Sequence, residues 1–230
     1  QGLAGKPVAD IRIDGAGKKV TRSDNCRVSD LSVSSDNLTF TYEAKSLPYP
    51  IDTSYYDNEK HTQADALSVI SFMDEMNYEG LSVSGLSDGY YGLTIGGEFI
   101  GRFTARELER GINMALLQNT PQYKQAMKIR QMNEERWLKE RKMREFYWVE
   151  YNLMRKTGML WACDEAAVDT LRKYRPHDIF LQWNGDLWLQ YMHKGIREDC
   201  VNEQQNLVDR IYEQNKPIPL RIEIKKFTDL

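Results

Sequence analysis

The sequence lacks several features that would restrict its function. Its 230 residues include only three cysteines, Cys26, Cys163 and Cys200, and an odd number at wide spacing does not predict a disulfide framework. No apolar run approaches the roughly 20 residues of a membrane span. The first residues, QGLAGKPVAD, lack the charged and apolar regions of a signal peptide. The net charge is −3, so no basic surface for nucleic acid is expected.

Motifs for binding metals or phosphate are also missing. Zinc sites usually pair their ligands as C-x₂-C or H-E-x-x-H, and neither pattern occurs in this chain. Cys163 and His177 have no such paired partners and are expected to fill helix faces. The glycines do not form the phosphate-binding pattern G-x-x-x-x-G-K-[ST]. The sequence therefore predicts no metal and no cofactor.

The chain does have an ordinary globular composition, 41% hydrophobic and 28% charged, whose pattern changes near residue 104. Before that point, segments such as VADIRID (8–14) and NLTFTYEA (37–44) alternate apolar and polar residues, which is typical of half-buried antiparallel strands. After it, Thr104 and Glu107 have the spacing of a helix capping box. The second part should therefore be helical.

One long helix dominates this second part. Thr120 is a candidate N-cap, followed by a proline at the first helical position, and no further glycine or proline occurs before Gly158. Such a helix would be about 55 Å long if unbroken. Shorter helices are expected at about 164–174, 186–194 and 199–214, and LRIEIKKF alternates as a final strand.

These patterns predict an α+β fold. We expect a small antiparallel, β-sandwich-like domain in residues 1–103 and a helical bundle with one long helix in residues 104–216. Residues 217–230 should return as a closing strand that packs on the β domain.

The candidate for catalysis is Gly85-Leu86-Ser87-Asp88-Gly89, a literal G-x-S-x-G. A nucleophile elbow requires a strand, a sharp turn and then a helix, whereas the following YYGLTIGGEFIG is β-prone and rich in glycine. We therefore interpret the segment as a β-hairpin with Asp88-Gly89 at its tip. None of His61, His177 and His193 follows an aspartate by three residues, so a partner for Ser87 is not recognisable, although a distant one stays open.

Neighbouring carboxylates are weaker candidates. Asp74 with Glu75, or Glu107 with Glu109, could in principle do acid–base chemistry. The sequence favours first-turn helix acids or a solvated face for all four. We therefore predict no catalytic residue in this chain.

Two aromatic stretches could line a ligand groove. One contains Phe146, Tyr147 and Trp148 with Tyr151, and the other is FLQWNGDLWLQYM (180–192). At helical spacing such residues more often belong to a core, which is the interpretation favoured here.

The order of these segments resembles one region of bacterial SGNH/GDSL-type esterases. The most specific matches are TARELERGINMA (104–115) and NKPIPLRIEI (215–224), and the similarity extends over nearly the whole chain. The family's catalytic blocks, G-D-S and D-x-x-H, are absent, because Gly185-Asp186 is followed by Leu187. The resemblance implies a non-catalytic C-terminal accessory region, with QGLAGKP at the exit of the hydrolase core.

This resemblance also implies a partner, a substrate and a location. The partner would be an N-terminal hydrolase domain, the substrate an acyl or carbohydrate ester, and the location an exported one. The chain by itself would be inactive. An alternative is a free-standing carbohydrate- or protein-binding module with an exposed aromatic row at Tyr90, Tyr91 and Phe99. An enzyme that uses Ser87 or a carboxylate pair ranks last.

Overall fold

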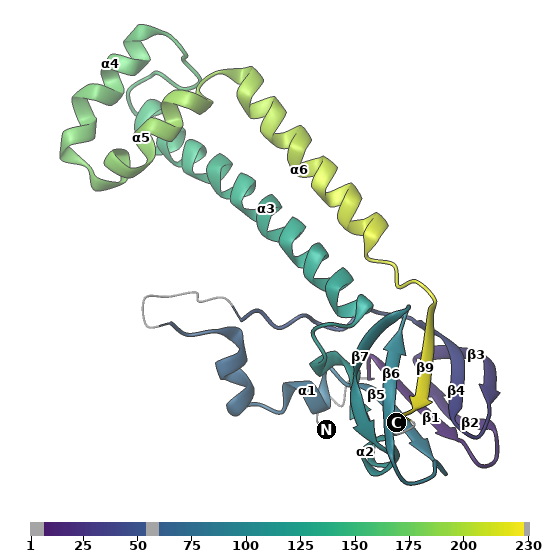
Figure 1. The fold of residues 1–230 in the computed structure, drawn as a ribbon. Coiled ribbons are helices and arrows are strands. Elements are labelled where there is room, and N and C mark those ends of the chain that lie inside the picture. The colour runs from purple at the N-terminus through teal and green to yellow at the C-terminus, as the bar shows by residue number, and fades with distance from the viewer. Residues whose placement is uncertain (1–6, 54–59, 228–230) are drawn as a thin grey trace, which may run out of the picture. The chain divides into compact units, whose positions relative to one another are not determined.

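Nine strands form two β-sheets in a computed structural model that describes residues 7–53 and 60–227 (Figure 1). The four-stranded sheet has the order β2-β1-β5-β8, and the five-stranded sheet has the order β3-β4-β9-β6-β7. The strands are β1 (Ala9–Asp14), β2 (Lys19–Asp24), β3 (Cys26–Val33), β4 (Asn37–Ala44), β5 (Glu79–Ser84), β6 (Tyr90–Ile95), β7 (Glu98–Thr104), β8 (Ile112–Asn113) and β9 (Leu220–Lys226). All pairings are antiparallel except that of β1 with β5.

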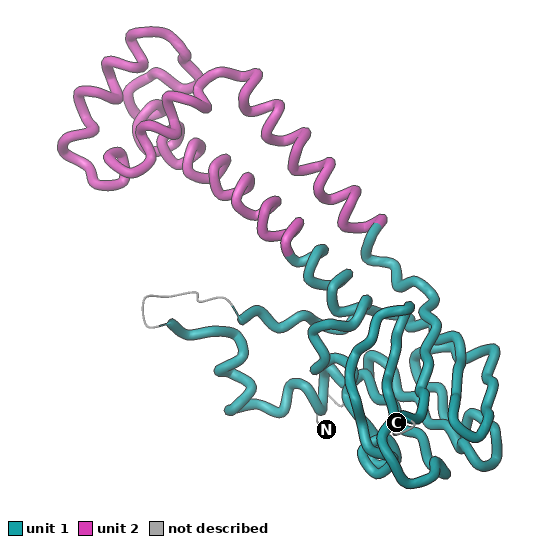
Figure 2. The backbone as a smooth tube through the Cα atoms, in the orientation of Figure 1, with its two compact units in different colours: residues 1–130, 214–230 teal, residues 131–213 magenta. Residues whose placement is uncertain are grey.

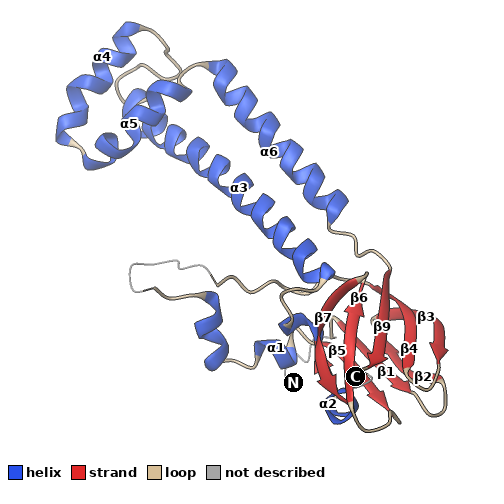
Figure 3. Cartoon of the chain, viewed as in Figure 1, coloured by secondary structure: helices blue, strands red, loops and turns tan. Residues whose placement is uncertain are grey.

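Helices occupy most of the second half of the chain (Figure 3). The earlier helical segments are η1 (Gln63–Ser68), α1 (Phe72–Glu75), α2 (Ala105–Arg110) and η2 (Met114–Leu116). The later ones are α3 (Pro121–Val149), the π-helical turn η3 (Glu150–Met154), α4 (Glu165–Tyr174), η4 (Arg175–His177), α5 (Ile179–Tyr191) and α6 (Lys194–Gln214). The predicted α+β class, with its long helix and closing strand, is confirmed. The closing strand β9 lies between β4 and β6.

The chain divides into two compact units (Figure 2). A β unit comprises residues 1–130 and 214–230, and a helical unit comprises residues 131–213. The division that we made from the sequence, at residues 103 and 216, stays a prediction.

The core of the β unit follows from the alternation along its strands. Leu38, Phe40 and Tyr42 on β4 point inward and are almost fully buried, while the threonines between them are half-buried. They share one hydrophobic cluster with residues of the other sheet, such as Ile11 and Leu81. Each such side chain contributes about 1.5–3 kcal/mol by burial.

The core of the helical unit is built from the end of α3 and from α4, α5 and α6. Phe146 and Val149 of α3 cluster with Leu171 of α4 and Trp188 of α5. Asp164 caps α4 by accepting a hydrogen bond from the Ala167 backbone N–H at 3.0 Å. Such caps satisfy N–H groups that have no partner in the helix.

The predicted hairpin at residues 85–89 is wrong. A strand does follow Ser87, but β5 pairs with β1 and β8, whereas β6 pairs with β7 and β9. The segment therefore connects two sheets, with Gly85 and Gly89 at φ of 72° and 142°. Local alternation predicts a strand but not the sheet that it joins.

Candidate functional site

A hollow of about 630 Å³ lies within the helical unit. It is lined by Met143 and Tyr147 of α3, by Trp161 of the following loop, and by Arg197 and Val201 of α6. Its volume lies in the range of roughly 300–1,000 Å³ that is usual for small-molecule sites. The hollow is therefore large enough for a small organic ligand.

The long helix changes its geometry beside this hollow. At η3 the helix widens to π geometry, and the Arg155 N–H donates to the carbonyl of Glu150 at 2.8 Å. Single π-turns inside α-helices occur frequently at functional sites. Here the π-turn coincides with the burial of a charged residue, because Glu150 is only 1% exposed.

The carboxylate of Glu150 links three elements of the helical unit. Its Oε1 accepts a hydrogen bond from Trp188 Nε1 at 2.8 Å, and its Oε2 accepts one from the Trp161 backbone N–H at 3.0 Å. Buried polar groups are destabilising unless they are hydrogen-bonded. Glu150 therefore holds the loop that carries Trp161 against α5.

Trp161 has a strained backbone. Its φ is 64°, in the left-handed region that bulky residues rarely adopt. Strain of this kind persists only where the surroundings enforce it, and it clusters at functional sites. The N–H bond to Glu150 is such a constraint. We infer that the loop is shaped to place the Trp161 ring.

That ring belongs to an aromatic wall. The Trp161 ring centre is 6.1 Å from that of Tyr147 and 6.0 Å from that of Tyr151, and the rings are nearly perpendicular. All three residues remain partly exposed, between 38% and 46%. Aromatic side chains offer a large apolar surface to a ligand at little cost in conformational entropy. The wall therefore suits a ligand with an aromatic body.

The α6 side of the hollow is charged and fixed. Arg197 lies over the Phe146 ring, 4.8 Å from its centre, and donates to the carbonyls of Tyr191 and Met192 at 2.6 and 2.7 Å. Lys194 pairs with Glu198 at 3.4 Å. The contacts of Arg197 hold its guanidinium in place, whereas the pair of Lys194 and Glu198 is exposed to solvent. The arrangement has the size and the polar groups of a binding site, and the described lining residues include no paired nucleophile and base.

Ser87 lies in the β unit and has other partners. Its Oγ accepts a hydrogen bond from Lys226 Nζ at 2.7 Å and lies 3.1 Å from the Tyr91 hydroxyl. A Ser–Lys pair is a known catalytic arrangement, but there the lysine must accept a proton. The contact between Lys226 and Ser87 is exposed to solvent. The contact joins the end of β9 to the segment before β6.

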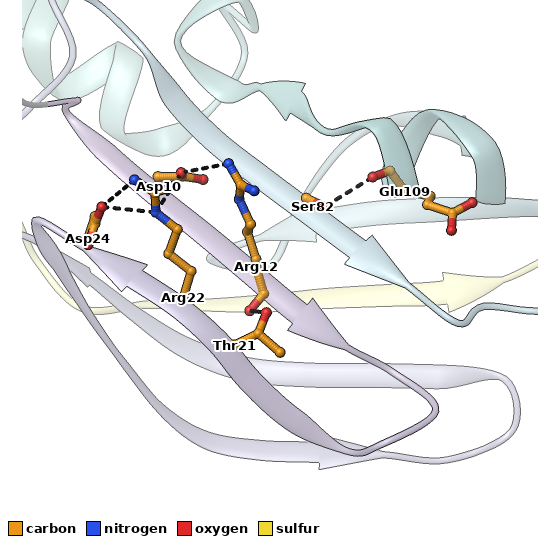
Figure 4. A network of polar contacts seen from close by, with 7 residues as sticks. All are labelled: Asp10, Arg12, Thr21, Arg22, Asp24, Ser82 and Glu109. Carbon is orange, nitrogen blue, oxygen red and sulfur yellow. Dashed lines mark hydrogen bonds and ion pairs between the residues drawn. The ribbon is translucent and has the colours of Figure 1, made fainter. Parts of the chain in front are cut away.

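The predicted carboxylate candidates occupy helix termini. Glu107 closes the capping box predicted with Thr104, and the hydrogen bonds from the Thr104 backbone N–H and hydroxyl lower the pKa of Glu107. Asp74 and Glu75 lie in the first turn of α1. The backbone carbonyl of Glu109 accepts from the Ser82 hydroxyl at 3.1 Å (Figure 4).

A network of four charged residues crosses the edge of the four-stranded sheet. Figure 4 shows Asp10 of β1 between two guanidinium groups, with Arg22 at 3.0 Å and Arg12 at 3.3 Å. Arg22 also pairs with Asp24. Two aspartates balance two arginines, so the network links β1 to β2 rather than offering an open charge to a ligand.

The β unit contains a buried carboxylate that was not predicted from the sequence. Glu79 is fully buried at the start of β5, where it accepts hydrogen bonds from the Tyr42 hydroxyl at 2.8 Å and from Gln122 Nε2 at 3.2 Å. Burial raises the pKa of Glu79 to about 7. Because solvent does not reach this carboxyl group, its contacts tie β4, β5 and the start of α3 together. The signal available in the sequence was a glutamate at the start of the alternating segment EGLSVS (79–84).

The aromatic candidates divide between core and surface. Phe146 is fully buried, whereas Tyr147 and Tyr151 are partly exposed. In the predicted exposed row, Tyr90 and Phe99 do face solvent, but Tyr91 is only 2% exposed. Tyr91 points inward because side chains alternate along β6.

Residues 7–53 and 60–227 contain neither a cluster of potential metal ligands nor a helix suited to cross a membrane. No three potential metal ligands come together in this part of the chain. None of its helices combines the length and the apolar character needed to cross a membrane.

The helical unit matches a known protein family, and nearly the whole chain matches a solved structure. Residues 127–216 match the family profile of the diltiazem deacetylase C-terminal helical domain. A solved structure of BT4096, a gut microbial diltiazem-metabolizing enzyme, is 36% identical in sequence and superimposes with a TM-score of 0.91. The match covers 99% of this chain and 51% of that enzyme, so the chain spans about half of the enzyme's length. A comparison with curated proteins gives no significant match.

These findings correct the resemblance drawn from the sequence. The chain is similar to an accessory region of a deacetylase, but the assignment to SGNH/GDSL-type esterases is wrong, because the matches are to diltiazem deacetylase and to BT4096. The segments that suggested that family, 104–115 and 215–224, contain a helix cap and a strand. Such local signals recur in unrelated proteins.

Proposed function

We propose that this chain is the non-catalytic part of an ester hydrolase that resembles diltiazem deacetylase. Its helical unit would bind the aromatic part of an ester substrate in the hollow beside Trp161. A separate catalytic domain would cleave the ester, and the helical unit would shape access to that site. The hollow with its strained Trp161, in the region that matches the deacetylase domain, carries this proposal.

Binding of diltiazem to the 230-residue chain tests the role of the hollow. Calorimetric titration should show binding that weakens about tenfold or more in Trp161→Asn, because a ring contact contributes about 1.5–3 kcal/mol. Asparagine tolerates the left-handed backbone and keeps the N–H that donates to Glu150.

A matched control uses another exposed tryptophan. Trp137 lies on α3 outside the hollow and is 42% exposed, so Trp137→Asn should leave the affinity unchanged. Absence of diltiazem binding, or equal losses in both variants, would contradict the proposed role of the hollow.

The non-catalytic role has its own assay. The chain alone should not hydrolyse p-nitrophenyl acetate or diltiazem. Clear turnover that disappears in Ser87→Ala would show that the chain is itself the esterase and would refute this part of the proposal.

A further inference from the structure

The outer face of the five-stranded sheet carries three exposed aromatic rings. Tyr90 of β6, Phe99 of β7 and Phe227 after β9 are 49%, 59% and 42% exposed. Tyr91 and Leu93 alternate with this set and point into the core. Isolated apolar residues on a surface are common, whereas a group of rings marks a site of interaction.

Gly92 lies beneath two of these rings. A Cβ atom at this position would be 3.2 Å from the Phe99 ring and 3.3 Å from the Phe227 ring. The two ring centres are 6.5 Å apart, with their planes at 78°. The glycine therefore lets both rings close over the sheet backbone.

Two cations flank the same glycine. Gly92 pairs with Arg102 on β7 and with Lys225 on β9, and directly paired residues share a face of the sheet. The glutamates of the same two strands have other partners. Glu98 of β7 pairs with Lys124, and Glu223 of β9 accepts a hydrogen bond from Asn37 at 3.0 Å. No carboxylate of the described residues pairs with Arg102 or Lys225.

Arg102 is held in place by rings rather than by an acid. Its guanidinium carbon lies 3.8 Å from the centre of the Tyr90 ring and 5.2 Å from that of Phe227, both within the roughly 6 Å range of cation–π contacts. Stacking of this kind fixes the guanidinium plane and leaves its N–H groups available. Such a planar group matches a carboxylate with two parallel hydrogen bonds.

We propose that this face, formed by Tyr90, Phe99, Arg102, Lys225 and Phe227, binds an acidic carbohydrate built of hexuronate units. The apolar C–H face of a sugar ring would stack on Phe99, the more exposed of the two perpendicular rings, and its edge would contact Phe227. The carboxylate of this sugar would bind Arg102, and the next carboxylate along the chain would reach Lys225. Two cations lie beside the exposed rings, which matches a ligand that repeats an apolar ring face and a carboxylate. The site lies in the β unit and is independent of the proposed role in ester hydrolysis.

Calorimetry with the 230-residue chain and trimers of galacturonate, glucuronate and mannuronate tests the proposal. At least one trimer should bind, its methyl ester should bind at least tenfold more weakly, and added salt should weaken the binding. Arg102→Gln should weaken it at least tenfold and Phe99→Ala severalfold. The control Arg110→Gln, on the exposed side of α2, should bind as the unchanged chain does, and thermal unfolding confirms that each variant is folded.

Three results would overturn the proposal. One is that none of the trimers binds. Another is that the methyl ester binds as tightly as the acid, which would remove the role of Arg102. The last is that a triglutamate peptide binds as tightly as the best trimer, which would make the face a site for acidic peptides.

Discussion

Replacement of Glu79 by glutamine should change how the stability of the β unit depends on pH. Glu79 is fully buried, and this burial raises the pKa of its carboxyl group from the usual 4.5 to about 7, although hydrogen bonds from Tyr42 and Gln122 oppose the rise. The folded chain therefore holds this proton more tightly than the unfolded chain does.

The sign and size of the effect follow from this difference. Because the pKa of Glu79 is raised in the folded chain, its bound proton stabilises the β unit. This stabilisation is fully present below about pH 4.5 and is lost as the pH rises through about 7. The complete loss corresponds to about 3 kcal/mol. Glutamine stays neutral, so Glu79→Gln should match the unchanged chain at pH 4.5 and exceed its unfolding free energy by up to about 3 kcal/mol above pH 8.

Urea unfolding between pH 4.5 and 8.5 measures this difference. Circular dichroism of the strands follows the β unit, whereas all five tryptophans lie in residues 131–213 and follow the helical unit, which provides an internal reference. Glu109→Gln, at an exposed glutamate of α2 in the same unit, is the matched control. The reasoning is refuted if Glu79→Gln shows the same pH dependence as the unchanged chain.

Three further changes test single contacts. Tyr42→Phe removes a donor to Glu79, so the pKa of Glu79 should rise further and the loss of stability should shift to higher pH in the same urea series. Glu150→Ala leaves the buried Trp188 Nε1–H and the part-buried Trp161 backbone N–H without their acceptor. It should lower the unfolding free energy of the helical unit by about 2–4 kcal/mol, measured by tryptophan fluorescence. Thr104→Ala removes the cap of α2 and should cost about 1 kcal/mol, measured by thermal unfolding of the β unit.

Features that depend on a few neighbouring residues could be predicted from the sequence. The capping box of Thr104 and Glu107 involves four consecutive residues, and its hydrogen bond is present at 3.2 Å. The alternation in residues 37–44 predicts the buried face of β4 in the same way. In both cases the physical cause lies within the segment itself.

Features that depend on distant partners could not be predicted. The segment 85–89 contains all the signals of a turn, yet its two strands belong to different sheets. The burial of Glu150 requires donors from Trp161 and from Trp188, which is 38 residues away. Nothing in the sequence EYNLM distinguishes a π-turn from another turn of α-helix, because the widening follows from these tertiary contacts.

The aromatic residues show why the candidate site could not be predicted from composition. Phe146 and Tyr147 are adjacent on α3, yet one fills the core and the other faces the hollow, as helical periodicity requires. Periodicity alone cannot say which face a neighbour covers. The Trp161 ring lies 6.4 Å from that of the buried Phe146 and remains 45% exposed, so it covers part of the core and leaves part of its surface to the hollow. The bonds to Glu150 therefore stabilise the helical unit and at the same time fix the ring that lines the hollow.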